Sequence, residues 1–156
     1  MQAEDKRRVK IRVNASGNRI IGYVYLAPEV HRASDFLNGP DPYLVVWDED
    51  QPLVGEGTFT AILKDAVSYV QAVEEPEAVK GLRRQGTLYT IVVQLEEPSV
   101  AIEAELFVPH ERKMPEVLND SRPFFSLRNA QLVKAPERYS YLAVGKKQSI
   151  LIRLRE

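Results

Sequence analysis

Two stretches decide the fold, because they repeat one pattern without a gap at an offset of 81 residues. Residues 26–54 read LAPEV HRASDFLNGP DPYLVVWDED QPLV, and residues 107–135 read FVPH ERKMPEVLND SRPFFSLRNA QLVKA. They share prolines, a Leu-Asn pair and an apolar pair: Pro28 with Pro109, Leu37-Asn38 with Leu118-Asn119, Pro42 with Pro123, and Tyr43-Leu44 with Phe124-Phe125. Agreement at a fixed spacing is typical of an internal repeat. We therefore predict that the second half of the chain duplicates the first.

Both copies alternate apolar and polar residues in the way that is typical of half-buried strands. Strands are expected over residues 10–13, 19–26, 43–47, 90–95, 100–108, 124–127, 139–144 and 149–154, with one or two more within 58–73. The predicted fold is mostly β, with two tandem small, strongly bent sheets or partly open barrels, each carrying one short helical turn. The expected boundaries are 1–75 for the first module, 76–86 for a polar linker and 87–156 for the second module.

The repeat also predicts an apolar outer surface on the first copy. Glu103 and Glu105 should face water, because an unpaired carboxylate is rarely buried. By the same offset, Val24 faces outward, and the alternation of the next strand turns Val45 and Trp47 outward as well. Contiguous exposed apolar surface tends to mark a contact region. These three residues are predicted to hold either the other module or a protein partner, unless a one-residue slip in register inverts the faces.

The loop and helical turn before the third strand of each copy provide a second candidate site. Ser34 is placed to cap the turn, and Asp35 favours the positive end of its dipole. Asn38 and Asn119 recur at the same place, where a left-handed residue ending the helix is one interpretation and an amide offered to a ligand is the other. Arg32, a cation close to the helix start, and Asp35 join Asn38 and Asn119 in this alternative ligand site.

Composition excludes several classes of function. The chain has no cysteine, so thiolate chemistry and disulfides are impossible, and its net charge of −1 gives no overall basic excess for nucleic acid. His31 and His110 lie in separate copies, and no acid–base, nucleophilic or metal-binding set can be assembled. We expect no enzyme activity, cofactor or metal. A charged N-terminus and the lack of a membrane-length apolar run indicate a cytoplasmic protein without a membrane partner.

Two resemblances attach to these residues. The stretch Gly17-Asn18-Arg19-Ile20-Ile21-Gly22-Tyr23-Val24, followed by Asp35-Phe36-Leu37-Asn38 and Val45-Val46-Trp47-Asp48, resembles the Sm-like small β-barrels, which implies an SH3/Sm-like fold and an Asn that contacts an RNA base. Residues 32–38, Arg-Ala-Ser-Asp-Phe-Leu-Asn, are similar to an Arg-x-Ser-Asp-Phe-Leu-Asn pattern of small uncharacterised bacterial proteins, which brings no established activity. In the second copy the pattern is Lys-Met-Pro-Glu-Val-Leu-Asn, so a ligand contact is expected in the first copy.

We therefore expect a non-enzymatic protein-interaction or scaffold module. Its partner would be another protein or a second copy of the chain, as in a homodimer, held by sheet edges and by the face around Trp47. The alternative is an Sm-like RNA-binding protein that uses Asn38, Asn119 and nearby cations.

Overall fold

A computed structural model describes residues 7–30, 32–48, 58–72 and 85–155. They form ten antiparallel strands in one unclosed sheet, with two short helices. The first half consists of β1 (Arg7–Ala15), β2 (Asn18–Leu26), α1 (Ala33–Leu37), β3 (Tyr43–Trp47), β4 (Phe59–Leu63), the 3₁₀ turn η2 (Lys64–Ala66) and β5 (Val67–Ala72). The second half consists of β6 (Gly86–Leu95), β7 (Ala101–Pro109), α2 (Met114–Leu118), β8 (Phe124–Leu132), β9 (Arg138–Gly145), η3 (Lys146–Gln148) and β10 (Ser149–Leu154). The mostly β prediction is confirmed.

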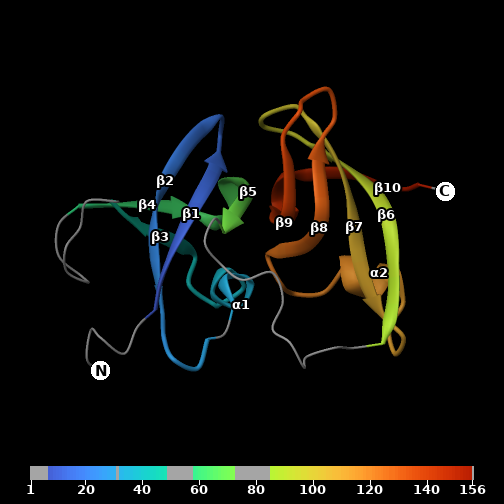
Figure 1. Ribbon diagram of the computed structural model, residues 1–156, viewed down its shortest axis with the longest axis horizontal. Helices are drawn as coiled ribbons and strands as arrows, with labels where there is room; N and C mark the ends of the chain where they lie inside the picture. Colours follow the sequence, from blue (N-terminus) through green and yellow to red (C-terminus); the bar gives the residue numbers. More distant parts are fainter. Residues whose placement is uncertain (1–6, 31, 49–57, 73–84, 156) are drawn as a thin grey trace.

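The two halves have the same strand order. The first half runs β5-β1-β2-β3-β4 and the second runs β10-β6-β7-β8-β9. Where two separate sheets were expected, the strands form one, because β9 pairs with β5 through Tyr69 opposite Val144 and Val70 opposite Ala143. We call this pairing the internal joint. It lies at the centre of the molecule in Figure 1, with β4 and β10 as the terminal strands of the sheet.

Val24 does not face outward, so that prediction is wrong. Its side chain is 1% exposed, whereas the neighbouring Tyr23 and Tyr25 are half-buried on the other face. The pairing registers of the two halves differ by one residue from the ungapped comparison. The offset of 81 residues matches Trp47 with Arg128. In the sheet, Trp47 lies opposite Tyr23, and Arg128 lies opposite Glu105. Tyr23 therefore corresponds to Glu105, and the resulting shift of one residue inverts every face assignment in β2.

Each half has its own apolar cluster, and each cluster also contains side chains from the other half. Phe124 and Ala143 of the second half belong to the first cluster, while Tyr69 of the first half belongs to the second cluster. Successive residues of a strand point to opposite faces. As a result, β5 places Val70 in one cluster and Tyr69 in the other. The internal joint is therefore buried on both faces, which explains why the sheet passes through it without interruption.

The helical turns lie where they were predicted, but their ends differ from expectation. Ser34 is not a cap: α1 begins after Arg32 without a side-chain capping bond, and Ser34 is 5% exposed inside the helix. Asn38 and Asn119 end the helices with φ of −87° and −101°, so neither adopts the left-handed conformation. Pro115 and a bond from the Lys113 N–H to the Glu116 carboxylate (2.9 Å) begin α2.

Candidate functional site

The predicted outer face survives in part, around Trp47. Val45 and Trp47 are half-buried on the face opposite the core, and the Trp47 ring lies 5.0 Å from that of Phe59 on β4. Val24 is absent from this face because it lies in the core. The halves do not meet here either, because the internal joint is formed by β5 and β9. The interpretation of this face as the contact between modules is therefore wrong.

The loop residues are not gathered into a single site. Arg32 and Asp35 form an ion pair at 3.7 Å within one helical turn, and both side chains are about half exposed. The Asn38 side-chain oxygen accepts the backbone N–H of Phe124 at 3.0 Å, so this amide ties the two halves together. The Asn119 amide donates to the carbonyl of Pro115 at 2.8 Å within its own helix. His110 is exposed, and His31 lies outside the described residues.

Five of the nine exposed large apolar residues that the structure describes lie on the two terminal strands, and the others are Ile21, Tyr43, Leu88 and Val133. On β4, Phe59 is 53% and Leu63 43% exposed; on β10, Ile150 is 60%, Leu151 47% and Leu154 53% exposed. The sequence reasoning assigned no faces in these strands. The sequence holds one signal, because the adjacent apolar residues 150–152 break the alternation that is typical of a strand with one face in water.

The corresponding strands at the internal joint are covered. The first four residues of β5, Val67–Val70, are all buried, whereas the first four of β10 are half-buried or exposed. In β9, Leu142 to Gly145 are buried, whereas β4 has only Ile62 buried. Strands that share a place in the two halves thus differ in burial according to whether a neighbouring strand is present. β4 and β10 thus have the apolar side chains of strands that are covered at the internal joint, but among the described residues no further strand covers them here.

Lys64 and Lys146 make matching contacts in the first and second halves of the sheet. The Lys64 amine donates to the carbonyl of Gly39 at 3.1 Å, and the Lys146 amine donates to the carbonyl of Asp120 at 2.8 Å. Burial, opposed in part by the charge of Asp41, lowers the pKa of Lys64. In the second half the contact is stronger, because the Asp120 carboxylate also accepts from Lys146 at 2.6 Å.

Asp120 is held as a carboxylate by several cations. Arg122 contributes a contact of 2.8 Å and Arg112 one of 3.5 Å, in addition to the bond from Lys146. Burial alone would raise the pKa of Asp120, but the hydrogen bonds from Arg122 and Lys146 and the charge of Arg122 outweigh it. The pKa of Asp120 therefore lies well below its usual value.

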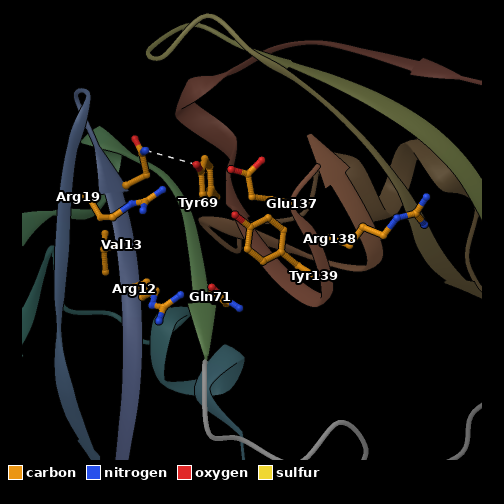
Figure 2. A pocket seen from close by; sticks show the side chains of 9 residues that line it. Arg12, Val13, Arg19, Tyr69, Gln71, Glu137, Arg138 and Tyr139 are labelled. Atoms are coloured by element: carbon orange, nitrogen blue, oxygen red, sulfur yellow. Dashed lines mark hydrogen bonds between the residues drawn. The ribbon is translucent and has the colours of Figure 1, made fainter. Parts of the chain in front are cut away.

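A polar cleft of about 250 Å³ lies between the halves, beside the internal joint (Figure 2). Arg12 and Arg19 line it from the β1–β2 hairpin, and Tyr69 and Gln71 line it from β5. Glu137 and Tyr139 line it from the second half. Burial, Tyr69 and Glu137 raise the pKa of Tyr139, against the lowering effect of the two arginines.

Within the described ranges, no three His, Cys, Asp or Glu side chains are grouped as metal ligands require. Nor does any helix in that part of the chain have the length and apolar character needed to cross a membrane. Comparison of the chain with protein families, with curated proteins and with solved structures gives no match.

Proposed function

We propose that this chain is a non-enzymatic protein-interaction module that binds a second copy of itself by joining β4 of one copy to β10 of the next. In this proposal the two halves are duplicated small barrels of the SH3/Sm-like type. The observation that carries it is the exposure of apolar side chains on two terminal strands whose counterparts are buried at the internal joint. An unpaired strand edge accepts an added strand readily, because the backbone N–H and C=O groups along it are free to bond.

The duplication is supported by pairing register as well as by strand order. In the first half Val13 lies opposite Val70, and in the second half Val93 lies opposite Ile152. All four side chains point to the same kind of environment, apolar and at least half-buried. The β1–β5 pair and the β6–β10 pair also each have one shift of register, at the end where β5 and β10 begin. Agreement in both pairing and irregularity is expected of copies of one module.

The correspondence gives the register of the proposed contact. At the internal joint Tyr69 lies opposite Val144 and Val70 opposite Ala143. Leu151 and Ile152 on β10 hold the places of Tyr69 and Val70, and Ile62 and Ala61 on β4 hold the places of Val144 and Ala143. The proposed contact between two chains therefore places Leu151 opposite Ile62 and Ile152 opposite Ala61. Tyr69 enters the apolar cluster of the neighbouring half. Leu151, 47% exposed in one chain alone, would enter the first cluster of the next copy in the same way.

One residue prevents the two joints from being identical. Gly145 leaves room for the carbonyl of Val67, which a Cβ at this position would overlap. Its counterpart on β4 is Leu63, with a similar backbone conformation (φ −62°, ψ 123°, against −71°, 126° at Gly145). The chain around Ser149 of the added copy must therefore shift away from Leu63, and the pairing is carried by the Ala61–Ile152 end. Leu63 weakens the association and limits its extent.

Because β4 and β10 are different surfaces, the contact is head-to-tail and produces rings or open chains. Size-exclusion chromatography with light scattering tests it, with the expectation of species heavier than the 17.7 kDa single chain that dissociate on dilution. Leu151→Lys should abolish these species. Leu88→Lys is the matched control, because Leu88 is 45% exposed on β6 and lies outside residues 91–95, the part of that strand that pairs with β10. A chain that stays single at high concentration would refute the proposal.

A further inference from the structure

We infer that the cleft between the two halves binds a small phosphate monoester through Arg12 and Arg19. This site is separate from the strand edges used for self-association, since it lies beside the internal joint. The inference rests on the cations, the hydroxyl groups and the carboxylate that line the cleft.

Arg12 and Arg19 stand on one face of the β1–β2 hairpin. Asn14 pairs directly with Arg19 across the hairpin, and Arg12 is two residues from Asn14 on the same strand. Side chains in this diagonal relation lie on one face and are within reach of each other when they are long. Figure 2 shows both guanidinium groups extending toward the second half. Neither takes part in any ion pair between described residues, so two cations face the cleft without a bound carboxylate.

Two tyrosines add hydroxyl donors to the cleft, Tyr69 from β5 and Tyr139 from β9 in the second half. The rings of Tyr69 and Tyr139 lie 6.4 Å apart, and Tyr69 is only 8% exposed. Because the pKa of Tyr139 is raised, its phenol stays protonated at neutral pH and can donate a hydrogen bond. Two arginines combined with phenol donors suit a phosphate group, since a guanidinium binds two phosphate oxygens at once.

Two further residues narrow the class of ligand. The side-chain oxygen of Asn14 is buried and has no hydrogen-bond partner, while its amide nitrogen lies 3.4 Å from the Tyr69 hydroxyl. The Asn14 amide therefore faces Tyr69, and the Glu137 carboxylate is the acceptor that the hydroxyl group of an organic phosphate can reach from the cleft. Glu137 opposes any anion, so the ligand's charge must lie on the Arg12–Arg19 side. The volume of about 250 Å³ admits a phosphate with a small alcohol portion but not a large cofactor.

The cations belong to this cleft alone and are not a feature of both halves. Arg12 pairs with β5, and the residue at the same place on β6, which pairs with β10, is Val92. Arg19 pairs with Asn14, and the residue at the same place on β7, which pairs with Gln94, is Ala101. The second half therefore has apolar residues where the first has arginines. The charge distribution distinguishes the cleft from the proposed contact between chains.

Titration of the ¹⁵N-labelled protein with glycerol 3-phosphate and inorganic phosphate, at constant ionic strength, tests the inference. Saturable shifts are expected at Arg12, Asn14, Arg19 and Tyr139, with glycerol 3-phosphate binding more tightly than phosphate. Arg12→Gln and Arg19→Gln should each weaken binding about tenfold, the effect of losing one charge-assisted hydrogen bond. Glu137→Gln should strengthen it.

Arg153→Gln is the matched control, because it removes one exposed arginine on β10, away from the cleft, and should leave the affinity unchanged. Equal weakening in all three arginine variants would mean general charge screening and would overturn the inference. So would the absence of saturable shifts, or binding of a single-stranded RNA pool without binding of either small phosphate.

Discussion

Lys64 and Lys146 hold one position in two halves of the sheet. The backbone N–H of Lys64 donates to the carbonyl of Pro42 and that of Lys146 to the carbonyl of Pro123, each at 2.9 Å. Both side chains turn back to a carbonyl three residues before that proline, Gly39 in one half and Asp120 in the other. The two lysine amines differ in one contact, because the Asp120 carboxylate also accepts a bond from Lys146 and Gly39 has no side chain to do so for Lys64.

This difference predicts unequal effects of removing the two amines. Lys146→Met should lower the free energy of unfolding by about 2–3 kcal/mol, because the bonds from its amine to the Asp120 carbonyl and carboxylate are both lost. Lys64→Met should cost about 1 kcal/mol or less, because relief from burying the charge offsets the lost bond. Urea unfolding of both variants measures the difference. Equal costs would show that the Asp120 contact adds nothing.

The lowered pKa of Asp120 predicts a loss of stability in acid. Its pKa in the folded chain lies below the unfolded value of about 3.9, so the stabilisation is fully present above that pH and is lost as the pH falls through the folded value. Asp120→Asn should therefore be less stable than the wild type at pH 7, and the gap should narrow below pH 4. Unfolding free energies measured from pH 7 to 2.5 test this. A gap that stays constant with pH would contradict the assignment.

Gly145 should be essential to the internal joint. Gly145→Ala places a Cβ on the carbonyl of Val67 and should cost about 1–3 kcal/mol, the usual range for overpacking. Gly39→Ala is the control, because its Cβ would lie 3.2 Å from the carbonyl of Phe36 and needs only a small adjustment. Thermal unfolding compares the two. On β4, Leu63→Gly should act in the opposite sense and raise the mass of the associated species seen by light scattering.

The corrected register of β2 makes its own prediction. Val24→Ala should lower the unfolding free energy by about 2 kcal/mol, because Val24 is 1% exposed and its methyl groups fill the core. Val45→Ala, on the half-buried outer face, should cost less than half as much. Chemical unfolding of the pair checks this. Similar, small costs at the two positions would restore the face assignment that the ungapped repeat suggests, in which both residues point outward.

The repeat in the sequence predicts most strands well, since Tyr43–Trp47 and Ser149–Leu154 form strands with the expected bounds. It cannot predict the face of Val24, because a one-residue difference in register between the halves leaves the apolar pattern plausible in either phase. The cleft was missed for a different reason. Arg12 and Tyr139 are brought together by the β5–β9 pairing, which is a long-range contact without a local signal.

Disulfide trapping tests the proposed association most directly, and the chain has no native cysteine to interfere. One preparation carries Ala61→Cys, another Ile152→Cys, and the two are mixed under mild oxidation. We predict rapid disulfide formation between the two variants, little within either variant alone, and little when Val133→Cys, on an exposed residue beyond β8, replaces Ile152→Cys. No bond between the first pair, or faster bonding of one variant to itself, would contradict the head-to-tail contact of β4 with β10.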